Sequence, residues 1–352
     1  MKPPDEKQAI SEIAAILADL LGGPPKAIKV DATDPRQKVD FYISTPDHLF
    51  LGEYKSNAQA SIVAVGIEQL QQYAQAAAVA GLPLLVVPYM GEVGRQLCDQ
   101  AGVSWLDLSG NAKIVAPGLH VRVEGRPNKY LDRGRPPNAF APKSSRVARQ
   151  LLLHPHQFQA QVALVRATEL EAGYVSKIVR RLGQEQYLET NEAGAVRPRD
   201  PDLLLDAWHD SYDFSRHRII KGHVAARSGD ELIQRVAQAV GQENVDWAVT
   251  GLGAAWLYTR FAAFRLATVY LSPMPPRSLL KALDFSDEPK GANLWLVLPD
   301  DEGVFHGSQE QDAVRCVSPI QTYLDLKGQP ERSKDAAAEL RRKLLNWGRH
   351  GS

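Results

Sequence analysis

The residues best suited to chemistry are two acids and one amine in the first third of the chain, Asp40, Glu53 and Lys55. Carboxylate oxygens are the ligands that Mg²⁺ prefers in proteins. An ammonium group beside such a metal can stabilise the negative charge that develops on a phosphate under attack. These residue types therefore predict metal-assisted hydrolysis of a phosphate ester, with Mg²⁺ or Mn²⁺ as the cofactor.

Three further side chains could complete this site. Gln69 and Tyr73 are four residues apart, so they share one face of an expected helix. Glu12 lies on an earlier expected helix and could add a third carboxylate to the metal ligands Asp40 and Glu53. The alternative is that Asp40 ends a turn and that the other acid pairs with its lysine on the surface, since exposed charges on a hairpin need no function.

The elements expected to position these residues alternate between helices and strands. Hydrophobic spacing and turn residues predict helices over residues 5–21, 62–80 and 92–101, and strands over residues 38–44, 48–55, 82–88 and 104–108. Pro46-Asp47 stands between the first two strands and favours a hairpin. Alternation along the second strand places Glu53 and Lys55 on the same face. The pattern predicts an α/β fold with a mixed sheet.

The order Asp40, Glu53-x-Lys55, Gln69-x-x-x-Tyr73 resembles the PD-(D/E)xK restriction-endonuclease-like superfamily. The resemblance covers roughly residues 5–113, and Lys38-Val39 stands where the name-giving proline would be. The resemblance implies that the acids bind Mg²⁺ and that the lysine supports attack of water on a DNA phosphate. It also implies that the two helix residues help to place the DNA.

Composition shows where a polyanion could bind. The 352 residues are 44% hydrophobic and 23% charged, which excludes a mainly disordered protein. Forty-one basic and 41 acidic residues cancel, so a nucleic-acid site must come from local clustering. Residues 118–181 contain twelve basic and four acidic residues, and this block is the expected DNA-binding region. Its first part, residues 118–143, is rich in proline, glycine and arginine and is typical of a linker.

A helix-turn-helix pattern follows this basic segment. Helices are expected over residues 144–154, 159–168 and 175–182, with a glycine-bearing turn before the third and a wing strand from Tyr187. This predicts a winged helix-turn-helix over residues 144–200 that binds double-stranded DNA. The expected DNA contacts are Ser176, Lys177, Arg180, Arg181, Arg146 and Arg149. The alternative is a three-helix packing module that binds no DNA.

Residues 201–352 predict an α/β scaffold without catalytic groups. Thr250-Gly-Leu-Gly-Ala-Ala255 lacks a Walker lysine and Rossmann spacing, and favours a close-packed turn between a strand and a helix. With the segments 105–112, 317–326 and 336–340, this region resembles the AbiEi-type antitoxins of type IV toxin–antitoxin systems. That resemblance implies a degenerate minimal nucleotidyltransferase fold, a homodimer, a toxin-type partner protein and a role in transcription regulation.

Two functions are consistent with this organisation. The first is a Mg²⁺-dependent DNA endonuclease, with a nuclease-like domain over residues 1–117 and DNA targeting by the winged helix. The alternative is a non-catalytic DNA-binding repressor with a vestigial nuclease domain. The N-terminus has no secretory signal, and the longest apolar run is shorter than the roughly 20 residues that span a membrane. With two sparse cysteines, expected to be buried, this predicts a cytoplasmic protein without a membrane partner.

Overall fold

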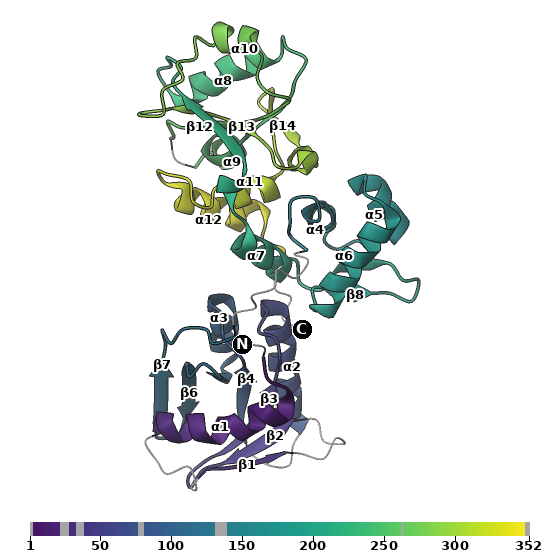
Figure 1. Ribbon diagram of the computed structural model, residues 1–352, viewed down its shortest axis with the longest axis vertical. Helices are drawn as coiled ribbons and strands as arrows, with labels where there is room; N and C mark the ends of the chain where they lie inside the picture. The colour runs from purple at the N-terminus through teal and green to yellow at the C-terminus, as the bar shows by residue number, and fades with distance from the viewer. Residues whose placement is uncertain are drawn as a thin grey trace. The chain divides into compact units, whose positions relative to one another are not determined.

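The computed structural model describes residues 3–21, 28–32, 39–76, 81–130, 139–261 and 263–348. The chain forms two compact units, residues 1–136 and 137–352. Both units combine helices with β-sheet, so the expected α/β class is confirmed (Figure 1). Residue 38 of the first expected strand, residues 77–80 of an expected helix and residues 131–138 of the expected linker lie outside the described residues.

The first unit contains a seven-stranded sheet in which the strands lie in sequence order. Three central strands are parallel to one another: β3 (Leu49–Tyr54), β4 (Leu82–Val87) and β5 (Ser104–Asp107). Helices connect them, as parallel strands require. Antiparallel pairings add β1 (Lys29–Ala32) and β2 (Phe41–Ser44) at one edge, and β6 (Ala112–Ala116) and β7 (Leu119–Val123) at the other.

Helices cover both faces of this sheet. The buried residues of α1 (Glu6–Leu21), among them Ile13 and Leu17, share one core with Phe41, Ile43 and Leu84 of the strands. On the other face, Gly66 of α2 (Ala60–Ala76) lies against Leu85, the strand residue that points the opposite way from its neighbours. α3 (Glu92–Ala101) packs beside α2 through Gly94 and Val63. The sheet is therefore the middle of three layers (Figure 1).

The sequence pattern locates most of these elements within a few residues but misses the edges of the sheet. Strand β6 follows the turn that Gly110-Asn111 predicts, but strands β1 and β7 were not expected, and β7 lies inside the segment 118–143 that was interpreted as a linker. That boundary is corrected: Gly118 takes a positive φ of 75° in the turn before β7, and the strand then pairs with β6 along its whole length. The composition of this segment resembles a linker, but pairing with β6 makes residues 119–123 a strand.

The second unit begins with three helices and a hairpin. These elements are α4 (Ser145–Leu153), α5 (Gln161–Thr168), α6 (Ala172–Gln184), β8 (Leu188–Thr190) and β9 (Val196–Pro198). Their apolar faces share one core that includes Val147, Leu164 and Val175. α6 begins three residues before its expected start, because Glu169 adopts a left-handed conformation (φ 57°) and completes the turn early.

A six-stranded mixed sheet forms the rest of the second unit. The strands lie in the order β10 (Arg218–Gly222), β13 (Leu294–Leu298), β12 (Ala267–Ser272), β11 (Asp246–Thr250), β15 (Val314–Cys316) and β14 (Gln309–Gln311). The accompanying helices are α7 (Pro201–Ser211), α8 (Gly229–Val240), α9 (Gly251–Thr259), α10 (Arg277–Ala282), α11 (Pro319–Asp325) and α12 (Ser333–Leu344). Strand and helix side chains meet in an extended core that includes Ile233, Val269 and Leu340.

Two further expectations concern single residues and membranes. Cys98 and Cys316 are both buried free thiols, as expected. Burial raises the pKa of each thiol to about 12, so both stay protonated at neutral pH. Across the described stretches of the chain, every helix is either too short or too polar to cross a bilayer.

Candidate functional site

The β2–β3 hairpin brings Asp40 next to Glu53. Phe41 pairs with Gly52 across the hairpin, and the Asp40 amide donates to the Gly52 carbonyl at 3.1 Å. Asp40 is therefore the cross-strand neighbour of Glu53, just outside the paired segment. The Asp40 carboxylate also accepts a hydrogen bond of 2.8 Å from the Tyr54 amide, which fixes it at this end of the hairpin.

Lys55 joins the hairpin to helix α2. Its Nζ donates to Glu53 Oε1 at 2.6 Å and to Gln69 Oε1 at 2.6 Å. The helix makes room for this contact at Gly66, where an added Cβ would lie 3.3 Å from Lys55 Cε and 2.8 Å from Leu85 Cδ1. The expected residues Glu53, Lys55 and Gln69 are thus brought together, and a glycine one turn before Gln69 permits it.

Tyr73 lies one turn further along α2, where its hydroxyl is 2.6 Å from the hydroxyl of Tyr42 on β2. Tyr42 and Asp40 alternate onto the same face of the hairpin as Glu53. Tyr73 therefore ties the helix to the hairpin strand beside the acids, while Gln69 is the helix residue that contacts the amine. Gln69 and Tyr73, which their spacing predicted to act together, therefore make two separate contacts.

The electrostatics of Glu53 show which charges surround it. Only 5% of the residue is exposed, and this burial raises the pKa of its carboxyl above the usual range. The Lys55 ammonium opposes the shift, whereas the negative charges of Asp40 and Glu6 add to it. The pKa of Glu6 is raised as well, first by burial and then by Asp40. Three carboxylates and one amine therefore act on one another at this point.

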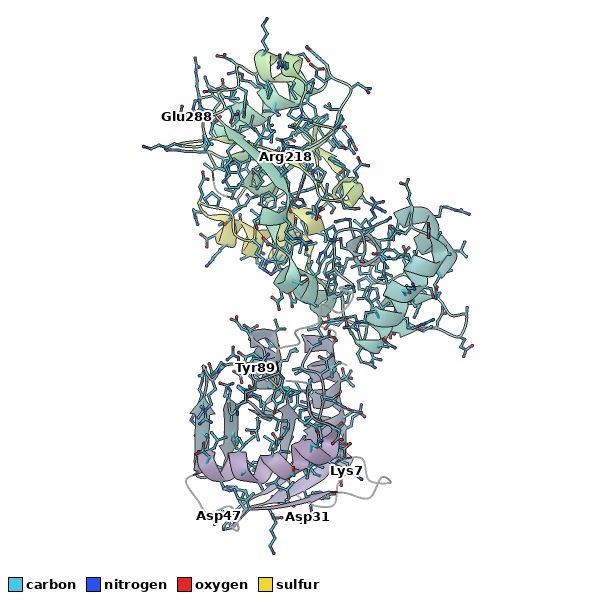
Figure 2. The ribbon with its side chains drawn as sticks, viewed as in Figure 1. Lys7, Asp31, Asp47, Tyr89, Arg218 and Glu288 are labelled. Atoms are coloured by element: carbon cyan, nitrogen blue, oxygen red, sulfur yellow. The ribbon has the colours of Figure 1, made fainter. Side chains whose placement is uncertain are left out.

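Glu6, and not Glu12, is the helix acid near this cluster. Tyr54 donates to the Pro4 carbonyl at 2.8 Å, which holds the start of α1 beside the end of β3. Lys7, labelled in Figure 2, follows Glu6 in the first turn. Glu12 lies further along the helix, where its carboxylate is 3.4 Å from the Tyr130 hydroxyl, so the expectation of Glu12 as the third carboxylate is corrected.

The donor set at this end of the hairpin matches the chemistry of a hard divalent cation. Asp40, Glu53 and Glu6 supply carboxylate oxygens, and a buried carboxyl with a raised pKa gains from a nearby positive charge. Within the described ranges, no three histidine, cysteine, aspartate or glutamate side chains are already arranged as a metal site. Glu53 is instead held by Lys55. Metal binding would require this carboxylate to be shared between the amine and the cation.

The segment 105–112 forms a buried polar turn. Asp107 is fully buried and accepts hydrogen bonds from the Met90 amide and from both the amide and side chain of Asn111. Asn111 in turn accepts from the Arg126 amide and donates to the Arg126 carbonyl. Gly110 has a φ of 98°, a conformation that favours glycine. These contacts tie the segment after β7 to the sheet, and they account for the motif structurally.

On helix α6, the described contacts separate free cations from paired ones. Lys177 and Arg180 are exposed and form no hydrogen bond or ion pair with any residue that the structure describes. Arg181 is ion-paired with Glu185, and Ser176 is half-buried. The buried stripe of the helix is Val175, Ile178, Val179 and Leu182. The polar face predicted from the sequence is therefore present, with two of its three cations available.

The two arginines of α4 do not belong to that surface. Arg149 is 2% exposed; its Nε donates to the Gly303 carbonyl at 2.8 Å and its Nη1 to Gln321 Oε1 at 2.9 Å. Arg146 forms a two-pronged ion pair with Asp301, at 2.7 and 3.0 Å. Their expectation as DNA contacts is corrected, because both side chains point into the second unit and bind its own groups.

A buried polar network in the second unit was not foreseen. Asp325 is fully buried and accepts hydrogen bonds from the hydroxyls of Tyr212, Tyr270 and Thr250 and from the Gln321 amide. Burial raises the pKa of Asp325 to about 6, although each of these bonds favours the charged form. Gln321 connects the carboxyl to the Arg149 guanidinium. No local sequence signal marks it, because its members are far apart in the chain, from Arg149 to Asp325.

The turn between β11 and α9 is close-packed. A Cβ on Gly253 would lie 2.6 Å from Ile233 Cδ1, so the glycine lets α9 approach α8. Gly251 has a φ of 59° at the start of the helix. These contacts support the expected structural explanation of the Thr250–Ala255 segment.

Comparisons with known proteins add no indication of function to this geometry. The geometry on which a function can be proposed is the cluster of Asp40, Glu53, Lys55 and Gln69, together with the exposed face of α6. No family model, no curated protein and no solved structure matches the chain.

Proposed function

We propose that the chain is a Mg²⁺-dependent DNA endonuclease, with a winged helix-turn-helix that directs it to duplex DNA. One observation carries the proposal: Lys55 Nζ lies 2.6 Å from both Glu53 Oε1 and Gln69 Oε1, at the end of a hairpin that also holds Asp40. A buried acid, a second acid and a positioned amine are the groups that metal-assisted phosphodiester hydrolysis needs.

In this proposal, Asp40, Glu53 and Glu6 would hold the metal, since their carboxylates influence one another. A bound Mg²⁺ or Mn²⁺ supplies a Lewis acid that polarises a phosphate oxygen and lowers the pKa of coordinated water. Lys55 donates hydrogen bonds toward the charge that develops on the phosphate. Gln69 positions Lys55, and the Tyr73–Tyr42 contact keeps α2 aligned with the hairpin.

The second unit supplies the proposed DNA-binding surface. α4, α5, α6 and the β8–β9 hairpin follow the order of a winged helix-turn-helix, in which the third helix enters the major groove. Lys177 and Arg180 are the cations on α6 without a described partner, so they are the proposed phosphate and base contacts. A homodimer and a toxin-type partner stay predictions that the described contacts do not address.

Plasmid cleavage with Mg²⁺ tests the nuclease proposal. Glu53→Gln and Lys55→Met should each lower the cleavage rate by about 10²-fold or more, the scale found when a group that stabilises transition-state charge is removed. Lys113→Met is a matched control, because Lys113 is also an ion-paired lysine of the first unit, bound to Asp99 at 2.8 Å. Equal cleavage by wild type, Glu53→Gln and Lys113→Met would reject the assignment.

A second candidate is a DNA-binding repressor without catalytic activity. The observation that favours it is that the described side chains form no ready metal site and Glu53 is already satisfied by Lys55. This candidate predicts no Mg²⁺-dependent cleavage by the wild-type chain. It also predicts a specific shift of duplex DNA that survives Glu53→Gln and weakens with Arg180→Ala.

A further inference from the structure

A cavity of about 610 Å³ lies in the second unit beside α7, α11 and α12. Its volume falls in the range of small-molecule sites, roughly 300–1,000 Å³. Four cationic side chains line it, and its described lining contains no acid: the cations are Lys327, Lys334, Arg341 and Arg342. Neither the candidate nuclease residues nor helix α6 contributes to this cavity, so it needs an explanation of its own.

Two of these cations have no carboxylate partner among the residues that the structure describes. Lys334 is exposed and makes no hydrogen bond or ion pair with any described residue. Lys327 donates its Nζ to the carbonyls of His209 and Asp210 at the end of α7, which fixes the amine without pairing it with a carboxylate. The cavity therefore carries an excess of positive charge at its wall.

The arginines are oriented more firmly. Arg341 Nη2 lies 2.8 Å from Asp202 and 3.1 Å from Asp206, and Arg342 pairs with Glu339 at 2.8 Å. Arg341 Nη1 is enclosed and has no hydrogen-bond acceptor among the residues that the structure describes. Both arginines are thus held by the protein's own carboxylates, and the positive charge left for a ligand lies on the two lysines of the wall.

The remaining wall is aromatic and apolar. The rings of His209 and Tyr323 lie 4.9 Å apart, and Leu326, Ala337 and Ala338 add aliphatic surface. The pKa of His209 is lowered to about 4, first by burial and then by the charges of Lys327 and Arg341. At neutral pH its ring is therefore uncharged, and the wall offers planar, apolar contact beside the cations.

We infer that this cavity binds a small phosphorylated ligand with a planar body, of the size and chemistry of a nucleotide. The phosphate group is placed against Lys334 and Lys327, since ammonium groups without a carboxylate partner bind phosphate as point charges. The planar body is placed against the His209–Tyr323 pair and the alanines of α12. The inference is independent of nuclease activity, because it uses none of the residues of that site.

Calorimetric titration of the full-length chain tests the inference, with ATP, AMP and inorganic phosphate as separate probes. ATP and AMP should bind, and inorganic phosphate should bind more weakly because it lacks the planar body. Lys334→Glu should weaken ATP binding by about tenfold or more. Lys290→Glu is the control, since Lys290 is another exposed lysine of the second unit, with no described partner, and it does not line the cavity.

A second variant tests the space of the cavity independently of its charge. Ala338→Trp fills the space from an exposed helix position and should abolish nucleotide binding while the chain stays folded. Three results would overturn the inference: no nucleotide binding at millimolar concentration, equal binding by wild type and both variants, or an effect of Lys334→Glu on duplex DNA binding alone. The last result would assign the lysines to nucleic acid instead.

Discussion

Lys55 and Arg149 are cations with opposite surroundings, and the difference separates a candidate catalytic group from a structural one. Lys55 stays partly exposed, with 19% of its side chain accessible, between a carboxylate and an amide at the end of a hairpin. Arg149 is 2% exposed, and its described hydrogen bonds go to the protein's own oxygens. Of these two cations, Lys55 is therefore the one accessible to an outside partner.

Gly66→Ala tests how Lys55 is positioned. A Cβ at this site would crowd Leu85 and the Lys55 stem, so Lys55 should be displaced from Gln69 and Mg²⁺-dependent cleavage should fall by about tenfold or more. Gly183→Ala on α6 is the control, because no atom lies within 4 Å of an added Cβ there. An unchanged cleavage rate for Gly66→Ala would show that the contact with Gln69 is dispensable.

Arg149→Met should lower the free energy of unfolding by about 2 kcal/mol or more. The reason is that the Gly303 carbonyl and Gln321 Oε1 lose their donor in a buried place. Arg180→Met should change stability by no more than about 0.5 kcal/mol, since Arg180 is exposed and unpaired among the described residues. Urea denaturation followed by circular dichroism measures both, and equal midpoints for the two variants would contradict the assignment.

At the scale of elements, helix α6 has one face in the core and one face exposed to solvent. Its apolar stripe is buried in the three-helix core, and its remaining residues are mostly exposed. The adjacent hairpin places Arg197 over the Phe158 ring at 4.3 Å, so that cation contributes to packing. The Arg197 cation of the hairpin is therefore engaged in packing, whereas Lys177 and Arg180 of α6 have no partner among the described residues.

Arg180→Ala should weaken binding to duplex DNA by a similar factor for all sequences if Arg180 contacts phosphate. The slope of log affinity against log salt should then decrease by about 1, because one fewer phosphate is neutralised. Electrophoretic shifts at several salt concentrations give this slope. Arg149→Met, although less stable, should keep the wild-type slope. A reduced slope for that variant would show that Arg149 contacts DNA.

At the scale of the whole molecule, the two units have separate cores and separate candidate functions. The first unit holds the acid–amine cluster on a sheet covered by α1 on one face and α2 on the other. The second unit combines the three-helix region with a six-stranded sheet, and Arg146 and Arg149 connect the two through residues 301–303. Stability of the second unit therefore depends on buried polar contacts as well as on apolar packing.

The contribution of one buried polar contact to stability, that of His217, can be measured as a function of pH. Burial lowers its pKa from 6.5 to about 4. Its Nδ1 accepts from the Asp300 amide and its Nε2 lies 3.0 Å from the Tyr212 hydroxyl, a pattern that fits the neutral ring. A lowered folded-state pKa gives stability that is present above pH 6.5 and is lost as the pH falls to about 4, worth about 3 kcal/mol.

In His217→Gln, the free energy of unfolding should therefore fall less steeply between pH 6.5 and 4. The slope should decrease by up to about 1.4 kcal/mol per pH unit, the value for one proton. The raised pKa of Asp325, about 6, acts in the opposite direction: its contribution is present at low pH and is lost as the pH rises through 6. The comparison of variant with wild type removes this common background. Parallel pH profiles for the two chains would show that His217 is not titrated on unfolding.

The sequence by itself determined the central elements and the core of the candidate site. Helix periodicity located α3 to the residue, strand alternation placed Glu53 and Lys55 on one face, and four-residue spacing placed Gln69 and Tyr73 on one face of α2. These signals are local, because side chains two apart on a strand or four apart on a helix share a face whatever the rest of the chain does.

Only the tertiary structure decided which charges face outward and which elements meet. It put Glu6 in place of Glu12 beside Glu53, turned Arg149 inward, and paired β7 with β6 inside a segment whose composition resembles a linker. It also assembled the network around Asp325. Each of these outcomes depends on residues far apart in the chain, and burial and pairing between distant segments cannot be read from local spacing.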